Sequence, residues 1–144
     1  MKKEKLKQYR GLTKEIARLE RAIEKHYAEL EALPAIPGKV EGSRSEHPYT
    51  LQSIPVMATD ATRADEIKRQ IKRKKYRIKI NQQKVKRIEK YISGIDDSIN
   101  RQIFEMIFLD GMSYENVANV LRYSKTAVAM RVKRHFENVN NVNV

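Results

Sequence analysis

The stretch that decides the fold covers residues 96–137 and reads DDSINRQIFEMIFLDGMSYENVANVLRYSKTAVAMRVKRHFE. It predicts three short helices, each preceded by a side chain that can cap a helix N-terminus: Asp96 or Asp97, then Ser113, then Ser124. Gly111 is expected to close the first helix. Apolar side chains recur at helical spacing and predict one small core, formed by Ile99, Ile103, Phe104, Ile107, Phe108, Val117, Ala118, Leu121, Val128, Val132 and Phe136.

The second and third predicted helices fit the plan of a helix-turn-helix motif. In that motif a helix of about eight residues and a turn of about three residues precede a more basic helix. Residues 124–136 hold four basic and no acidic side chains, and the small Ala118 suits a tight helix crossing. We therefore predict a DNA-binding module over residues 96–137. The alternative is a plain three-helix knob whose last helix is basic by chance.

Nine residues of this module are predicted to contact DNA. Arg131 and Lys125 would reach base edges or nearby phosphates, and Thr126 would touch a thymine methyl group. Two further cations of the third helix would bind phosphates, as would the start of the second helix. The predicted set is Ser113, Tyr114, Ser124, Lys125, Thr126, Ala129, Arg131, Lys133 and Arg134.

A known pattern lies in residues 111–134, which read GMSYENVANVLRYSKTAVAMRVKR. This run resembles region 4 of sigma-70-type factors, whose pattern is roughly Gly-x-Ser-Tyr-x-x-Ile-Ala-x-x-Leu-Gly-x-Ser-x-x-Thr-Val-x-x-Arg-Leu. Two positions depart from that pattern. Arg122 stands where the turn usually has Gly, at a position that often needs a positive φ, so the turn would be either strained or differently shaped. Ala127 replaces a Thr.

Over nearly its whole length the chain is similar to the ArpU/RinA-like transcriptional regulators of phages and prophages of Gram-positive bacteria. The similarity includes a Val-x-Gly-Ser…Pro-Tyr element at residues 40–49. It implies an N-terminal coiled coil joined to a module like sigma region 4, and sequence-specific binding to double-stranded DNA. It further implies control of late phage genes, such as those for packaging or lysis, in the cytoplasm and nucleoid of the bacterial host cell.

The N-terminal region predicts a long helix over residues 6–33, which Pro34 and Pro37 end. Its apolar positions alternate in spacing between four and three residues, as in the a and d positions of a heptad repeat. The seam is formed by Leu12, Ile16, Leu19, Ile23, His26, Leu30 and Leu33. His26 is interpreted as a tolerated edge residue rather than a metal ligand.

A second heptad pattern predicts a helix over residues 62–94, capped by Asp60 or Thr62 and ended by Gly94. Its seam is formed by Ile67, Ile71, Lys74, Ile78, Asn81, Val85, Ile88 and Ile92. The two helices are similar in length, which favours an antiparallel helical hairpin, although a homo-oligomer through the same seams is equally allowed. The polar Lys74 and Asn81 either fix the register or the oligomeric state of the seam, or they mark a place open to water.

The expected organisation is therefore all-α. Residues 1–95 would form the hairpin or coiled coil, residues 96–137 the helix-turn-helix module, and residues 138–144 a flexible tail with some β propensity. The connector at 34–60 is too long for an ordinary loop. It would form either a short β-hairpin turning around residues 42–47, with Tyr49 and Leu51 on one face, or an ordered loop at the tip of the helical hairpin.

The charge of the chain is concentrated in one segment. The 144 residues carry a net charge of +12, and residues 61–95 alone hold 13 basic and 3 acidic side chains. Such a segment favours an anionic partner, of which nucleic acid is the commonest, over a merely solvated helix face. We also expect no membrane span, because no run approaches the roughly 18 apolar residues that one requires.

An enzyme, a cofactor and a metal site are not expected, because no Gly-rich phosphate loop, Cys nucleophile or metal-spaced cluster is present in the sequence. Two other functions remain open beside a DNA-binding regulator. One is an adaptor that binds RNA polymerase or a sigma factor, as sigma region 4 modules do. The other is a DNA-packaging protein similar to small terminase subunits.

Overall fold

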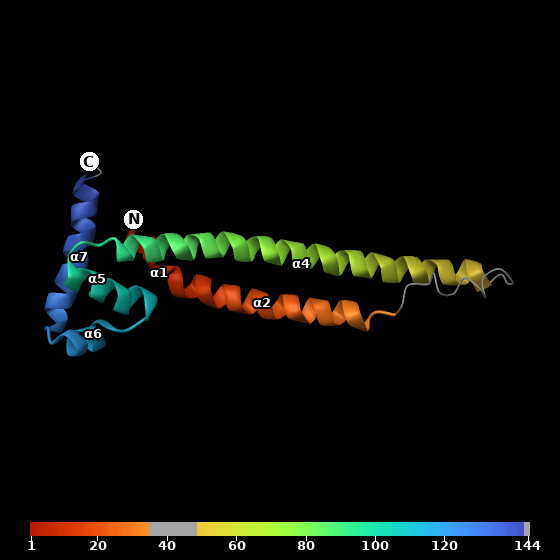
Figure 1. Ribbon diagram of the computed structural model, residues 1–144, viewed down its shortest axis with the longest axis horizontal. Coiled ribbons are helices and arrows are strands. Elements are labelled where there is room, and N and C mark those ends of the chain that lie inside the picture. The colour runs from red at the N-terminus through yellow and green to blue at the C-terminus, as the bar shows by residue number, and fades with distance from the viewer. Residues whose placement is uncertain (35–48, 143–144) are drawn as a thin grey trace. The chain divides into compact units, whose positions relative to one another are not determined.

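The structure is a computed structural model that describes the backbone of residues 1–34 and 49–142 and the side chains of residues 1–34 and 62–139. Within these residues all regular elements are helices (Figure 1), which confirms the predicted all-α class. The elements are α1 (Lys3–Lys7), α2 (Tyr9–Ala32), α4 (Tyr49–Ser93), α5 (Ser98–Phe104), the π-helix η2 (Glu105–Leu109), α6 (Tyr114–Leu121) and α7 (Lys125–Val142). The β-hairpin turn predicted at 42–47 lies outside the described residues.

Two compact units make up the chain. The first unit joins Met1–Ile16 to Lys79–Val144, and the second unit spans Ala17–Ile78. The first unit thus combines α1, the start of α2 and the end of α4 with all the helices that follow. The predicted domain boundary after residue 95 falls inside this unit.

The core of the first unit contains the residues predicted from the C-terminal pattern. Ile103, Phe104, Val117 and Val128 are fully buried, and further members of the predicted core are buried or partly buried around them. The N-terminal helix and the end of α4 complete this core, through the buried Leu6, Ile88 and Ile92. The C-terminal helices therefore do not form their core alone.

The second unit has a smaller core, built from the predicted heptad positions. Ile23 of α2 is buried together with Ile67 and Ile71 of α4, and Leu30, Leu33 and Ile78 pack around them. The seam residues of α2 and α4 thus contact each other within one chain. His26 lies beside this core with 14% of its side chain exposed, and its Nδ1 lies 3.5 Å from Oε1 of Glu29.

The polar seam position Asn81 lies in the first unit and is 2% exposed. Its side-chain amide donates a hydrogen bond to the carboxylate of Glu15, on the part of α2 that belongs to the same unit. A buried amide left without a partner would cost free energy, so this pair favours one register of α2 on α4. Of the two interpretations of Asn81, the structure supports register over an opening to water. Lys74, in the other unit, is half-buried.

The predicted start of the second long helix is wrong. Helix α4 begins at Tyr49 rather than at Thr62, so neither Asp60 nor Thr62 caps it, and Tyr49 and Leu51 lie in a helix instead of a strand. The sequence from 49 to 61 contains no Gly and includes good helix formers, which lets the helix extend upstream in spite of Pro55. Asp60 and Thr62, which are able to cap a helix, thus lie in the interior of α4.

Two other predicted ends also differ. The first helix begins at Lys3 instead of Leu6, and the chain turns at Gln8 between α1 and α2. At the other end α7 continues to Val142, so residues 138–142 are helical rather than a flexible tail. Neither Gly nor Pro occurs between 125 and 142, and nothing in the sequence breaks the helix there.

The helix that precedes the predicted motif begins and ends as expected, with one irregularity. The carboxylate of Asp97 accepts a hydrogen bond of 2.9 Å from the Asn100 N–H and so caps α5. After Phe104 the helix widens into η2, where the Asp110 N–H donates to the Glu105 carbonyl over 3.0 Å. Gly111 follows with a φ of +74°, a value that suits glycine, and ends the segment.

Candidate nucleic-acid interface

Helix α6 is fixed at its N-terminus by the predicted cap. The Ser113 hydroxyl oxygen accepts a hydrogen bond of 3.1 Å from the Asn116 N–H, which satisfies one of the free donors of the first turn. Val117 and Ala118 are buried at 0% and 4% exposure and hold the helix on the core of the first unit. Tyr114 is half-buried at the start of the helix.

The turn after α6 depends on a left-handed residue. Arg122 has φ 60° and ψ 42°, and among the described residues it is the one non-glycine residue with a positive φ. Its N–H and that of Tyr123 both point to the carbonyl of Ala118, the latter over 3.0 Å, as in a Schellman-type helix end. The expectation that this position needs a positive φ is confirmed.

The next helix, α7, begins immediately after this turn. The Ser124 hydroxyl oxygen accepts a hydrogen bond of 3.0 Å from the Ala127 N–H, so Ser124 caps α7 as predicted. Val128 and Val132, four residues apart, are buried at 0% and 2% exposure and seat the helix against α5 and α6. The helix therefore has one fixed inner face and one face directed outward.

Most of the predicted contact residues lie on or beside this outward face of α7. Lys125, Thr126, Lys133 and Arg134 are exposed, as are the two capping serines, whereas Ala129 and Tyr114 are half-buried. Helical spacing brings Lys125, Ala129 and Lys133 to one edge of the face and places Thr126 beside them. No acidic side chain interrupts α7 before Glu137. At the end of α7 that follows the turn, this face thus carries small and basic side chains.

Arg131 does not belong to this face. Its guanidinium donates a hydrogen bond of 3.0 Å to Oδ1 of Asn100 and lies 3.6 Å from Oδ1 of Asp97, both at the start of α5. The same group lies 5.5 Å from the ring centroid of Tyr123 in the turn. These contacts tie α7 to α5 and to the turn, which is a positioning role.

Sequence reasoning missed Met130 as a member of the outward face. Met130 is 37% exposed and lies four residues after Thr126, on the same side of α7. The helical spacing could have located it, since Met130 lies four residues after Thr126. The neighbouring Val120 of α6 and Tyr123 of the turn are also exposed, at 57% and 38%.

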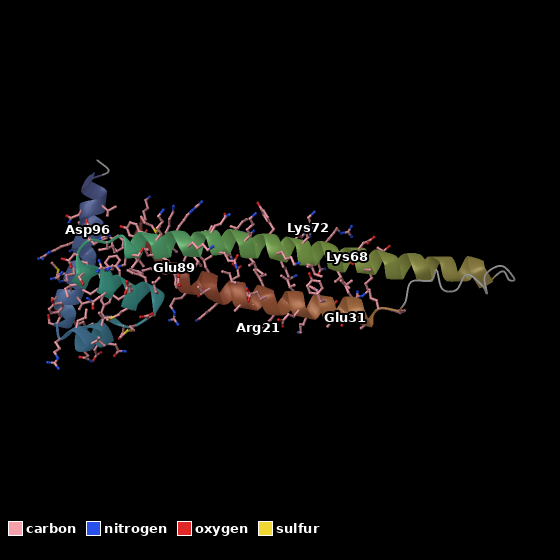
Figure 2. All side chains as sticks on the ribbon, in the orientation of Figure 1. Arg21, Glu31, Lys68, Lys72, Glu89 and Asp96 are labelled. Atoms are coloured by element: carbon pink, nitrogen blue, oxygen red, sulfur yellow. The ribbon has the colours of Figure 1, made fainter. Side chains whose placement is uncertain are left out.

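The basic segment of α4 forms a densely charged surface in each unit. In the second unit the exposed cations include Lys68 and Lys72, which Figure 2 labels on α4, and the helix adds Lys79, Lys84, Lys86, Arg87 and Lys90 in the first unit. Among the described side chains, Arg63 alone of this helix makes an ion pair, at 3.8 Å from Glu29. Most of the other cations of this segment are exposed, apart from the half-buried Lys74, and Lys75 lies 5.4 Å from the ring centroid of Tyr27.

A partly buried contact links the end of α4 to α7. The Tyr91 hydroxyl and Nε2 of His135 are 2.7 Å apart, and the His135 ring packs on Phe104 with the ring centroids 4.5 Å apart. Burial lowers the pKa of His135 below its ordinary value, and the positive N-terminal amino group lowers it further. Burial raises the pKa of Tyr91. Both shifts favour a neutral ring that accepts a hydrogen bond from the phenol.

Over the described part of the chain, no three His, Asp or Glu side chains gather as metal ligands would. The same residues include no helix long and apolar enough to cross a membrane. Compared with models of protein families, with curated proteins and with solved structures, the chain finds no match.

Proposed function

We propose that this protein is a sequence-specific DNA-binding transcriptional regulator without enzymatic activity. In this proposal α6 and α7 form a helix-turn-helix motif, and α7 enters the major groove of DNA. The observation that carries the proposal is the outward face of α7, where Lys125, Thr126 and Lys133 are exposed beside the small Ala129. Small side chains let the helix backbone approach base edges, while the lysines neutralise phosphates.

Two further observations are consistent with a helix-turn-helix motif. The turn between the helices is closed by a left-handed residue, and serine hydroxyls cap both helices. A plain helical knob would use the same caps and turn, but it would not need a basic outer face. The resemblance of residues 111–134 to sigma region 4 points the same way, and from the wider resemblance we propose control of late phage genes in a bacterial host.

The long helices would support this motif as an antiparallel hairpin. The seam residues of α2 and α4 contact each other within one chain, and the pairing of Glu15 with Asn81 fixes their register in the first unit. The exposed lysines of α4 would lie along flanking DNA and steepen the salt dependence of binding. A homo-oligomer through the seams would require α2 and α4 to exchange partners between chains.

A second candidate function is that of an adaptor for RNA polymerase. The exposed apolar side chains Val120 and Tyr123 favour it, because apolar groups beside a polar turn suit a protein partner better than a phosphate backbone. An adaptor would bind RNA polymerase tightly, and it would bind both random and enriched DNA duplexes weakly.

Enrichment of random duplex DNA by the purified full chain tests the proposal. Binding is carried out at about 0.15 M salt, where non-specific binding weakens to the micromolar range. We expect a recurring motif from the wild type, its loss in a Lys125→Ala/Thr126→Ala variant, and its retention in Lys25→Ala, a control that removes an exposed lysine of α2. Salt-sensitive binding with no recurring motif would refute a sequence-reading regulator.

A further inference from the structure

The N-terminal segment places three cations beside the start of α6. Lys3 and Lys7 lie one helical turn apart on α1, and Arg10 follows in the first turn of α2. Together with Ile107, Phe108 and Tyr114 they line one surface groove of the first unit. Neither the heptad pattern nor the helix-turn-helix pattern explains why these positions are basic, since none of the three belongs to either pattern.

Lys3 also connects this groove to the outward face of α7. The residues that line a neighbouring groove include Lys3, Tyr114, Ala129, Lys133 and Glu137. Ala129 and Lys133 are residues that we place against DNA. The cations of α1 thus continue the basic face of α7 across the start of α6, all within one compact unit.

The Arg10 side chain lies against the turn before α6. A Cβ added to Gly111 would collide with the Arg10 guanidinium, so the guanidinium lies directly over the glycine. Among the described side chains, none of the three cations forms an ion pair with a carboxylate. Acidic side chains in this region are Glu4 on α1, Asp110 next to Gly111, and Glu137 in the lining of the second groove. The groove beside α6 is lined by the three cations and by no carboxylate.

We propose that Lys3, Lys7 and Arg10 bind backbone phosphates of the duplex that α7 reads, next to the N-terminus of α6. The inference rests on the proposed function and adds a contact site from the opposite end of the chain. A DNA strand lying on Ala129 and Lys133 would pass the groove shared with Lys3, and its phosphates would then meet the remaining two cations. Three flexible or fork-shaped donors around the half-buried Tyr114 suit phosphate oxygens.

The same helix offers a matched control. Lys5 lies on another side of α1, where it lines a different groove with Gln8, Lys84 and Arg87. It is exposed, like Lys7, and it carries the same charge. A Lys5→Gln variant therefore removes one charge from α1 without touching the groove beside α6.

The test measures the dissociation constant of the full chain for a duplex recovered by enrichment, as a function of salt concentration. Losing two phosphate contacts makes the plot of log K against log salt less steep by about 1.8, which corresponds to an affinity about 30-fold weaker at about 0.15 M salt. We expect this loss in Lys3→Gln/Lys7→Gln, a near-complete recovery in Lys3→Arg/Lys7→Arg, and a change below threefold in Lys5→Gln. Circular dichroism would confirm that each variant is folded.

The outcomes separate this inference from the function on which it rests. If Lys125→Ala weakens binding while Lys3→Gln/Lys7→Gln binds like Lys5→Gln, the groove does not contact DNA and the inference is overturned alone. If the wild type itself binds no duplex, the proposed function fails and the inference fails with it.

Discussion

The left-handed conformation of Arg122 leads to a prediction with a definite sign. A residue with a Cβ pays about 1–2 kcal/mol for the left-handed region, whereas Gly enters it without that cost. Against this gain, Gly has more freedom in the unfolded chain, which costs about 0.5–1 kcal/mol. Arg122 is exposed, so little packing is lost with its side chain. Arg122→Gly should therefore raise the free energy of unfolding by about 0.5–1 kcal/mol, the net of these terms.

Urea unfolding followed by far-ultraviolet circular dichroism would measure this change. The midpoint should rise while the slope of the free energy against urea stays the same, since the surface exposed on unfolding does not change. In a thermal scan the expected shift is about 2–4 °C for a chain of this size. Arg122→Ala serves as the control, because it removes the same side chain and keeps the Cβ.

The reasoning would be refuted if Arg122→Gly lowered the midpoint, or if Arg122→Ala raised it equally. In the first case the Arg122 side chain itself would stabilise the turn by more than the conformational cost. In the second case the gain would come from losing the arginine charge and not from relief of the left-handed backbone.

Two other predictions concern side chains that hold α7 in place. The lowered pKa of His135 means that the unfolded state takes up the proton first, so the stability should be complete above about pH 6.5 and fall as the pH drops below that value. Thermal unfolding between pH 5 and 8 should show this fall in the wild type and a flatter dependence in His135→Gln. Parallel curves for the two proteins would exclude His135 as the cause. Arg131→Ala should lower the free energy of unfolding by about 1 kcal/mol, because it removes the hydrogen bond to Asn100 at a partly exposed site. It should leave the enriched DNA motif unchanged, and a relaxed motif without a stability loss would instead show that Arg131 reads a base.

Local chemistry explains which parts of the fold were predictable. Asp97, Ser113 and Ser124 cap their helices through hydrogen bonds to residues three positions ahead, so a short window of sequence contains both partners. The glycine that usually stands at position 122 indicated a positive φ there, but it left open whether Arg122 would adopt that φ or change the shape of the turn. The heptad seams likewise gave the buried faces of α2 and α4, since burial repeats with the period of the helix.

Contacts between distant segments were not predictable in this way. Arg131 was expected to reach DNA, and its partner Asn100 lies 31 positions away, a distance that no helical period indicates. The contribution of Leu6 to the C-terminal core and the position of Lys3 beside Tyr114 depend on how the N-terminal helix packs. The start of α4 was misplaced for a different reason, because residues able to cap a helix also occur inside one.

The central claim is that the outward face of α7 contacts DNA, and the methyl group of Met130 tests it most directly. Met130 is 37% exposed on that face, while the half-buried Met106 of η2 packs against the core of the same unit. Methyl spectra of the full chain with isotopically labelled methionine would be recorded during titration with an enriched duplex. We expect the Met130 signal to shift with DNA concentration and the Met106 signal to stay in place. An unchanged Met130 signal at saturating DNA would contradict the claim and place the bound duplex on another surface.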